Sequence, residues 1–341
     1  MTNTPAVSVL MPCYNAAATL DEAMASLVEQ TWGDMEVVAV DDGSQDGTAE
    51  RLRAWSNLDA RVRSIRLPHR GLVSALNAGL EVCRAALVAR MDADDRSEPE
   101  RLARQVAFLK QAPEIAAVGC LVQGFPPENV REGFRVYMDW LNSLVTPEDI
   151  ARAIWIESPL AHPSVVMRKE VLERLGGYQE RGWPEDYDLW LRMHLSGARL
   201  AKVPQVLLHW REYPERLTRT DRRYAVESFL RAKAHYLPAG PLLGRGTVIL
   251  WGAGQMGRRL SKHLVRAGAP LTAFIDIDPS KIGRQRRGLP IHAADDLPAL
   301  WRAADRPVVL VAVGARGARA LIREQLTTFG LREGEDWWAV A

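Results

Sequence analysis

Paired carboxylates follow two apolar segments within the first hundred residues of this 341-residue chain. Asp41 and Asp42 open the segment DDGSQDGT after the run EVVAV, and Asp92, Asp94 and Asp95 lie in MDADD after the run LVAR. Carboxylates two residues apart on a strand share one face, and such oxygen ligands suit a hard divalent cation that also binds substrate phosphates. The alternative is that these residues only form turns and helix entries, where Asp and Gly are common.

A third acidic segment, PEDYDLWLR, lies much later in the chain. Glu185, Asp186 and Asp188 fall in the first turn of a predicted helix, where the helix dipole stabilises ionised carboxylates. Two interpretations stay open: these residues only stabilise the helix start, or one of them faces a pocket and acts as a general base.

A glycine-rich turn marks the last part of the chain. Gly252, Gly254 and Gly257 form GAGQMG between a predicted strand and a predicted helix. Asp276 follows at about the 20-residue distance at which an acidic residue meets a ribose in dinucleotide-binding folds. Fewer than a hundred residues follow Gly252, which is short for a complete dinucleotide fold. Binding of NAD(P) or another nucleotide, in an oxidoreductase or a nucleotide-sensing module, and a purely structural role all stay open.

Alternating strands and helices must position these motifs. Continuous apolar runs such as residues 6–12 and 36–40 predict strands buried on both faces, and amphipathic segments between them predict helices. The pair Ser97 and Glu100 predicts the start of a further helix. We therefore expect an α/β fold with a mostly parallel sheet flanked by helices, in which ligands bind at the carboxyl ends of the strands. The motifs lie at those ends.

A Pro/Gly-rich stretch at residues 238–246 separates two regions of this alternating pattern. Such stretches are typical of domain boundaries. The sequence predicts a first domain over residues 1–237, a linker over 238–246 and a smaller Rossmann-like α/β domain over 247–341.

Composition and charge exclude several classes of function. Lys and Arg total 44 against 42 Asp and Glu, a net charge of +2, so we expect no nucleic-acid partner. The three cysteines lack the spacing of a zinc site or a secreted disulfide framework, which favours a reducing compartment. No signal-peptide pattern and no apolar run near the roughly 18 residues of a membrane span occurs. We expect a cytoplasmic location, with peripheral membrane contact left open.

Taken together, the motifs resemble those of glycosyltransferase family 2. The segments PCYN, DDGSQDGT, GLVSALNAG, MDADD, HPS and EDYDLWLR fall in the family's order at family-like intervals over about residues 5–235. The resemblance implies a GT-A-type fold and an inverting transfer of a sugar from a nucleotide-diphosphate sugar to an acceptor hydroxyl, assisted by Mg²⁺ or Mn²⁺. The acceptor, whether a glycan, a lipid-linked molecule or a small molecule, stays open, as does the oligomeric state.

The resemblance also implies roles for single residues. Asp186 matches the catalytic base and Asp94 the metal ligand. Asp42 would accept a hydrogen bond from the donor's base. His162, in HPS, is either a pocket residue or a packed, hydrogen-bonded histidine. The positions that match donor-binding residues are Pro12, Tyr14, Asn15, Asp42, Asn77 and Asp92.

One position departs from the family pattern. Many members carry an Arg-x-His segment whose His can reach the metal, but here Tyr213 follows Arg211 and Glu212. The third protein ligand therefore stays open. Because a neutral phenol is a poor ligand for Mg²⁺, the sequence predicts little effect of Tyr213→Phe.

Overall fold

A computed structural model describes residues 4–315 and 317–341 of the chain. Contacts between Cα atoms divide it into two compact units, each described by itself below. The first unit consists of the residues up to Ala151, Pro159–Arg181 and Glu185–Thr220, and the second of Arg152–Ser158, Gly182–Pro184 and Asp221–Ala341. Helix α10 (Val226–Tyr236) thus groups with the second unit. The predicted limits at 237 and 247 stay predictions.

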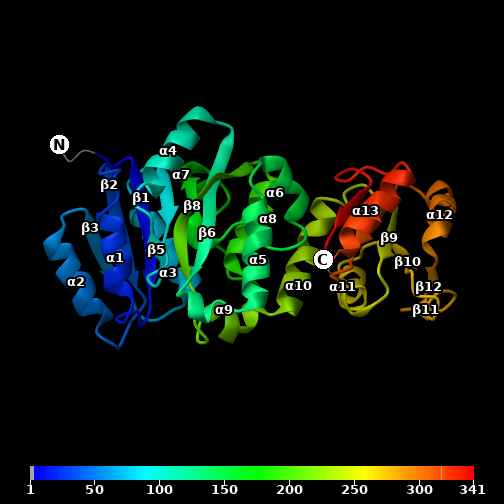
Figure 1. The fold of residues 1–341 in the computed structure, drawn as a ribbon, viewed down its shortest axis with the longest axis horizontal. Coiled ribbons are helices and arrows are strands. Elements are labelled where there is room, and N and C mark those ends of the chain that lie inside the picture. Colours follow the sequence, from blue (N-terminus) through cyan, green and yellow to red (C-terminus); the bar gives the residue numbers. More distant parts are fainter. Residues whose placement is uncertain (1–3, 316) are drawn as a thin grey trace. The chain divides into compact units, whose positions relative to one another are not determined.

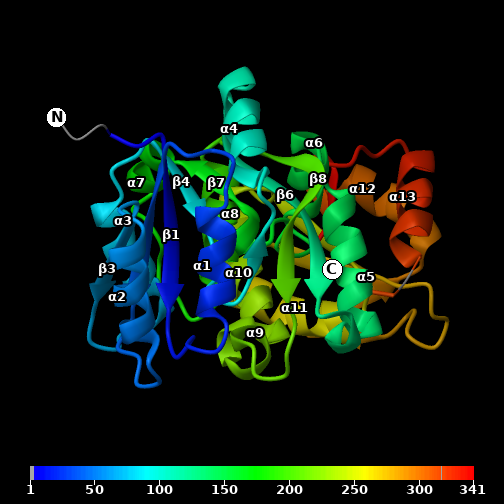
Figure 2. The same cartoon turned by 60° about the vertical axis from the view of Figure 1, so that its left-hand side comes forward.

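The first unit is built on an eight-stranded sheet in the order β3-β2-β1-β4-β7-β6-β8-β5 (Figures 1 and 2). Strands β1 to β4 are mutually parallel, as are β6 and β8, whereas β7 and β5 run antiparallel to their neighbours. The predicted mostly parallel sheet is confirmed, with two antiparallel strands added. The strands are β1 (Val7–Cys13), β2 (Met35–Asp41), β3 (Val62–Arg66), β4 (Leu87–Arg90), β5 (Arg96–Ser97), β6 (Ile115–Phe125), β7 (Val166–Arg168) and β8 (Arg199–Arg211).

Helices cover both faces of this sheet. Helix α1 shares a hydrophobic core with Val9 and Met11 of β1. Helix α3 instead meets Leu10, and a Cβ at its Gly79 would lie 2.2 Å from Leu10 Cδ1. Because successive strand residues point to opposite faces, α1 and α3 lie on opposite sides of the sheet. The helices are α1 (Leu20–Val28), α2 (Thr48–Leu58), α3 (Leu72–Val82), α4 (Arg101–Gln111), η1 (Pro127–Asn129), α5 (Glu132–Ser143), α6 (Pro147–Ala153), η2 (His162–Ser164), α7 (Lys169–Arg174), α8 (Glu185–Leu195) and α9 (Leu217–Thr220).

The prediction that a helix begins at Ser97 is wrong. Ser97 lies in β5, where it pairs with Leu208 of β8, and its N–H donates to Ser26 Oγ at 3.1 Å. Helix α4 begins only at Arg101. The main-chain hydrogen bonds to β8 replace the capping interactions that the sequence suggested.

The strand directions bring distant segments to one edge of the sheet. The carboxyl ends of the parallel strands β1, β2 and β4 meet there. Strand β7 is antiparallel to β4, so η2, which precedes it, lies at the same edge. Strand β8 is parallel to β6, which is itself antiparallel to β7, so β8 also ends there. This edge therefore collects the MDADD segment, the HPS segment and the residues that follow β8.

The second unit contains a six-stranded, mostly parallel sheet in the order β11-β12-β10-β9-β13-β14 (Figure 1). Strand β9 lies between β10 and β13 and is parallel to both. The expected second α/β domain is confirmed in its architecture. Its elements are η3 (Arg222–Tyr224), α10, η4 (Leu237–Ala239), β9 (Thr247–Trp251), α11 (Gln255–Arg266), β10 (Leu271–Ile275), β11 (Gln285–Arg286), β12 (Leu289–His292), η5 (Ala294–Asp296), α12 (Leu297–Ala303), β13 (Pro307–Val311), α13 (Ala318–Thr328) and β14 (Trp337–Ala339).

Candidate active site

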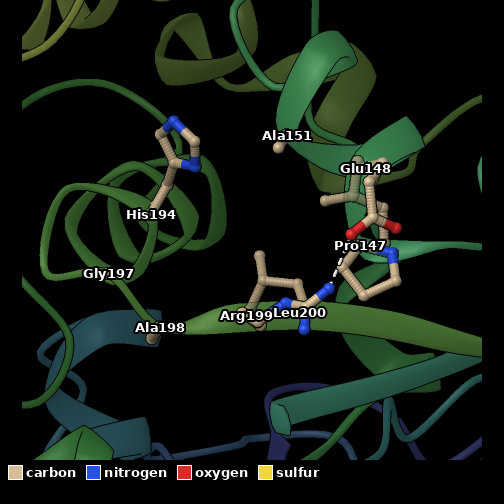
Figure 3. A pocket seen from close by; sticks show the side chains of 9 residues that line it. Pro147, Glu148, Ala151, His194, Gly197, Ala198, Arg199 and Leu200 are labelled. Carbon is tan, nitrogen blue, oxygen red and sulfur yellow. Dashed lines mark hydrogen bonds and ion pairs between the residues drawn. The ribbon is translucent and has the colours of Figure 1, made fainter. Parts of the chain in front are cut away.

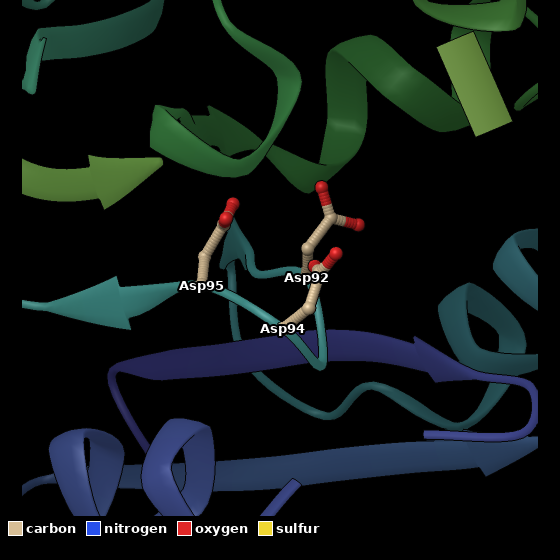
Figure 4. Close-up of side chains that lie close together, drawn as sticks. All are labelled: Asp92, Asp94 and Asp95. Atoms are coloured by element: carbon tan, nitrogen blue, oxygen red, sulfur yellow. The ribbon is translucent and has the colours of Figure 1, made fainter. Parts of the chain in front are cut away.

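The acidic loop, residues 91–95, follows β4 at the edge described above. Figure 4 shows the side chains of Asp92, Asp94 and Asp95 projecting to the same side of this loop. One carboxylate oxygen of each lies within 4.8 Å of the others. Asp95 is only 1% exposed, and its Oδ1 accepts the N–H of Arg211 at 2.8 Å. Its Oδ2 has no hydrogen-bond partner among the described residues.

Burial and mutual repulsion destabilise the negative charge of this loop. Burial is the main cause that raises the pKa of Asp94, and the neighbouring Asp92 carboxylate adds to it. Burial, followed by Asp94 and Asp92, raises the pKa of Asp95 well above its ordinary range. Clustered carboxylates with an unpartnered, buried oxygen fit a hard divalent cation, which would supply the missing positive charge. The residues present therefore suit the Mg²⁺ or Mn²⁺ that the sequence suggested.

A buried arginine pairs with the acidic loop, and its charge acts on His162 of the HPS segment. Arg90, 2% exposed, forms an ion pair with Asp92. Beside it, His162 Nε2 lies 3.0 Å from the Tyr178 hydroxyl, and His162 Nδ1 lies 3.7 Å from Glu185 Oε1. Burial, and next the positive charge of Arg90, lower the pKa of His162. His162 is thus a packed, hydrogen-bonded histidine.

The three carboxylates at the start of α8 lie in different environments. Asp188 is fully buried, and its Oδ2 accepts from Arg192 Nε at 2.7 Å. Glu185 is 2% exposed and faces His162. Asp186 is the partly exposed member of the three. Because the other two are buried, it is the one that an acceptor hydroxyl could approach from the solvent.

The PCYN turn and the DDGSQDGT turn are joined by hydrogen bonds. The Asn15 N–H donates to Ser44 Oγ at 2.9 Å, and Gln45 N–H donates to Asn15 Oδ1 at 3.0 Å. Asn15 has a φ of 49°, a left-handed conformation that Asn tolerates better than most residues. Pro12 lies buried within β1, whereas Tyr14 is 48% exposed. Of the predicted donor-binding residues, these two turns bring Tyr14, Asn15 and Asp42 together.

His69 completes this part of the site and was not predicted. Its ring stacks on Tyr14, with ring centroids 4.1 Å apart, and its Nδ1 lies 2.8 Å from Asp42 Oδ2. The Asp42 carboxylate also accepts the N–H groups of Arg70 and Gly71, each at 2.9 Å. Asp42 thus holds the segment before α3 in place, whether or not it also binds a ligand.

Asn77 is engaged within the protein. Its amide donates to the carbonyl of Tyr178 at 2.9 Å and accepts the Tyr178 N–H at 2.9 Å. This pair of hydrogen bonds fixes the segment that carries Tyr178. A direct contact of Asn77 with the donor stays a prediction.

The residues that end β8 contact the acidic loop. Arg211 Nε donates to the carbonyl of Asp94 at 2.6 Å, and the Tyr213 hydroxyl donates to Asp94 Oδ2 at 2.8 Å. His209 pairs instead with Glu98. The sequence pointed to position 213 through its place in the family pattern, but this contact with Asp94 is visible only in the fold.

A separate pocket of about 250 Å³ lies at the other end of β8, where that strand begins (Figure 3). Glu148 and Arg199, which form an ion pair at 2.6 Å, and His194 are among the residues that line it. None of the predicted site residues lines this pocket. It is thus distinct from the edge that carries the acidic loop.

In the second unit the GAGQMG turn links β9 to α11. A Cβ on Gly257 would lie 1.7 Å from the carbonyl oxygen of Gly252, so close packing of helix and turn requires glycine there. A Cβ on Gly254 would meet no atom within 4 Å. Asp276 Oδ2 accepts the N–H of Ala253 at 2.8 Å, and Lys281 Nζ lies 3.4 Å from its Oδ1. The four predicted residues therefore lie around one turn.

Comparisons with known proteins agree on one family. The family described as "Glycosyl transferase family 2" matches residues 8–176. The amylovoran biosynthesis glycosyltransferase AmsE of Erwinia amylovora is 35% identical over 207 residues, which cover 59% of this chain and 74% of AmsE. The putative glycosyltransferase EpsE of Bacillus subtilis is 28% identical over 301 residues, covering 86% of this chain and 100% of EpsE.

Solved structures share the fold. The mannosyltransferase PcManGT from Pyrobaculum calidifontis, in complex with GDP-Man and Mn²⁺, is 25% identical at a TM-score of 0.50. That likeness covers 69% of this chain and 63% of PcManGT. TarS 1-349 of S. aureus, in complex with UDP-GlcNAc, is 18% identical at a TM-score of 0.55 and covers 76% of this chain and 71% of TarS.

No helix among the described residues is both long and apolar enough to cross a membrane.

Strand order, the acidic loop at the sheet edge and the matched relatives lead to one assignment. The chain belongs to glycosyltransferase family 2, whose enzymes transfer a sugar from a nucleotide sugar.

Proposed function

We propose that this enzyme is an inverting, cation-assisted glycosyltransferase in which Asp186 is the general base and Asp94 the principal cation ligand. The observation that carries the proposal is that the buried Arg90, which pairs with Asp92 of the acidic loop, also interacts electrostatically with Glu185 at the start of α8. Donor diphosphate and acceptor hydroxyl must meet within one site, and these two motifs are the natural candidates for holding them.

Asp186 would take the proton of the acceptor hydroxyl while that oxygen attacks the anomeric carbon from the side opposite the leaving diphosphate. The stereochemistry at this carbon is then inverted. Glu185 and Asp188 are less suited to this role because both are buried and face internal cationic or imidazole partners. The partial exposure of Asp186 supports its assignment.

The donor would lie across the PCYN and DDGSQDGT turns. The stacked pair of Tyr14 and His69 offers an aromatic surface for a nucleobase, and Asp42 an acceptor for its N–H group. Asn15 holds the two turns in register, while Asp92 would approach the ribose. Pro12, being buried, would act only through the shape of β1.

Asp94, with Asp92 and Asp95 beside it, would hold the cation. A bound Mg²⁺ or Mn²⁺ supplies Lewis-acid assistance by neutralising the charge of the departing nucleoside diphosphate. Arg216, 9% exposed, adds a fixed positive charge close to Asp94 and Asp95. The leaving group then needs no proton donor, so no second catalytic carboxylate is required.

The titles of two structural relatives suggest which donors to test first. PcManGT was solved with GDP-Man and TarS with UDP-GlcNAc, so we infer a GDP- or UDP-linked sugar. AmsE takes part in amylovoran biosynthesis, which makes a glycan the first acceptor class to test.

A donor-hydrolysis screen tests the proposal directly. UDP- and GDP-sugars would be incubated with the full chain, and release of the nucleoside diphosphate measured with and without Mn²⁺. We expect release from one donor class, dependent on the cation and reduced in Asp94→Ala. Metal-independent release, or none from any nucleotide sugar, would contradict the proposal. NMR of the product's anomeric centre checks inversion.

A second function, nucleotide binding by the second unit, is favoured by one observation. The GAGQMG turn follows β9, and β9 has parallel neighbours on both sides, which is where ligands bind in open α/β sheets. Gly254, with open space around it, would let a phosphate approach the start of α11. Calorimetric titration of the full chain with UDP, GDP, NAD and NADP, in the wild type and in Gly254→Val, tests this function.

A further inference from the structure

The end of β8 holds the acidic loop through three hydrogen bonds. Arg211 donates its N–H to Asp95 Oδ1 at 2.8 Å and its Nε–H to the Asp94 carbonyl at 2.6 Å. The Tyr213 hydroxyl adds the third, to Asp94 Oδ2 at 2.8 Å. Of these, only the contact from Tyr213 reaches the side chain of Asp94. It therefore holds Asp94 Oδ2 in place.

Tyr213 acts here as a donor and not as a ligand. A phenol at neutral pH carries one proton, and a carboxylate can only accept. With its proton directed to Asp94 Oδ2, the phenol neutralises part of that oxygen's charge and leaves Oδ1 of the same carboxylate to face a ligand. Hydrogen bonds of this kind to a metal-binding carboxylate fix its orientation and tune the affinity of the site.

The possible ligands at the acidic loop are all oxygens. Among the residues that the structure describes, the group of side chains that could hold an ion here consists of Asp92, Asp94 and Asp95. Two histidines of neighbouring elements are engaged elsewhere, His209 with Glu98 and His162 with Tyr178. Carboxylate and phosphate oxygens suit Mg²⁺ and Mn²⁺, whereas an imidazole would favour Zn²⁺, Ni²⁺ or Co²⁺.

We propose that Tyr213 is a positioning residue that orients Asp94 and, because it is a hydrogen-bond donor and not a nitrogen ligand, keeps the affinity of this site for Co²⁺ and Zn²⁺, relative to Mn²⁺, lower than a histidine at position 213 would. The inference rests on the proposed cation site at Asp94 and adds its metal preference. It also reverses the expectation from sequence that Tyr213→Phe has little effect, because that substitution removes the donor from Asp94 Oδ2.

Metal binding, measured apart from turnover, tests this inference. Free Mn²⁺ is followed by electron paramagnetic resonance in the presence of UDP or GDP, for the wild type, Tyr213→Phe and Tyr213→His. We expect Tyr213→Phe to bind Mn²⁺ about 10- to 100-fold more weakly, as for other substitutions of groups that orient metal ligands. We expect Tyr213→His to bind Co²⁺ and Zn²⁺ more tightly, relative to Mn²⁺, than the wild type does, and to give bound Co²⁺ an absorption spectrum with a nitrogen ligand.

Tyr137→Phe is the matched control, because it removes a phenolic hydroxyl from α5, where the ring packs against Trp210. It should bind Mn²⁺ as the wild type does. If the folded Tyr213→Phe protein binds Mn²⁺ with wild-type affinity, or Tyr213→His leaves the ratio of Co²⁺ and Zn²⁺ affinity to Mn²⁺ affinity unchanged, the inference is wrong while the cation site stands. If the wild type binds no Mn²⁺ with either nucleotide, the proposed cation site fails and the role of Tyr213 fails with it. If Tyr213→Phe does not fold, the inference is tested by the metal affinities of Tyr213→His compared with those of the wild type.

Discussion

The acidic loop of the first unit and the GAGQMG turn of the second are both connections that leave a parallel strand, yet their charges are balanced differently. Asp276 is satisfied by its own surroundings, through the N–H of Ala253 and the ammonium group of Lys281. In the acidic loop Asp94 and Asp95 have raised pKa values, and Asp95 Oδ2 lacks a partner among the described residues. A carboxylate that its own fold leaves unsatisfied indicates a ligand more strongly than one that its fold has neutralised.

Replacing the proposed base should have the largest effect. We expect Asp186→Asn to lower kcat about 100- to 10,000-fold while leaving donor affinity nearly unchanged, because the amide keeps the size of the side chain but cannot accept the proton. Steady-state transfer rates and donor titration measure the two quantities.

Asp188→Asn is the contrasting variant, since Asp188 forms an internal ion pair with Arg192 and should affect thermal stability more than kcat. Turnover of Asp186→Asn within a few-fold of the wild type would move the base to another residue.

Removing the principal carboxylate of the acidic loop should abolish cation-dependent donor binding. Asp94→Ala is expected to weaken Mn²⁺ binding by at least about 10- to 100-fold, the loss seen when even indirect supports of a metal ligand are removed. Chelation by EDTA should stop turnover until Mg²⁺ or Mn²⁺ is restored. Asp139→Ala, on the exposed side of α5, serves as the control. Full activity after thorough chelation would show that the cation has no catalytic part.

Two glycine substitutions separate packing from binding in the second unit. Gly257→Ala should lower the melting temperature, because its Cβ would lie 1.7 Å from the Gly252 carbonyl oxygen. Gly254→Val should leave the melting temperature nearly unchanged, because no neighbouring atom lies within 4 Å of its Cβ, but should block a phosphate at the start of α11. Equal nucleotide affinity in the wild type and Gly254→Val would leave these glycines with a packing role alone.

A truncated chain tests whether the six-stranded sheet of the second unit is needed for the chemistry. All residues assigned to catalysis precede position 221, so a chain ending at Leu237 is expected to hydrolyse its donor at a rate within a few-fold of the full chain. Its melting temperature should fall, because Lys233 of α10 loses the carbonyl of Val340, to which it donates at 2.9 Å. A folded but inactive truncation would mean that both units form one catalytic body.

The smallest expected effect concerns pH. The folded-state pKa of His162 is lowered, so between about pH 6.5 and that lower value the unfolded chain binds more protons than the native one. The free energy of unfolding should therefore fall as pH drops below about 6.5, by up to about 1.4 kcal/mol for each unit of pKa difference. Urea unfolding of the wild type and His162→Gln measures this. The free energy of unfolding should depend less on pH in His162→Gln than in the wild type. His292→Gln, in the second unit, is the control and should keep the wild-type pH dependence. If both variants show the same pH dependence, His162 is not its cause.

The sequence alone was sufficient to predict a mostly parallel sheet and the family, but not the two antiparallel strands. Continuous apolar runs predicted the parallel strands, and because such strands end at one edge, the motifs after β1, β2 and β4 had to converge. Periodicity and motif order are local properties of the chain, so both were readable without a fold. The Ser97–Glu100 pair shows where local patterns fail. It predicted a helix start, but Ser97 instead lies in β5, which pairs with β8.

Only the tertiary structure decided which residues support the motifs. His69 stacks on Tyr14, Arg90 pairs with Asp92, and Tyr213 donates to Asp94 across 119 positions of sequence. Among the three carboxylates of α8, burial alone separates Asp186 from Asp188. These outcomes depend on long-range contacts and on the degree of burial, and neither quantity is encoded in the spacing of residues along the chain.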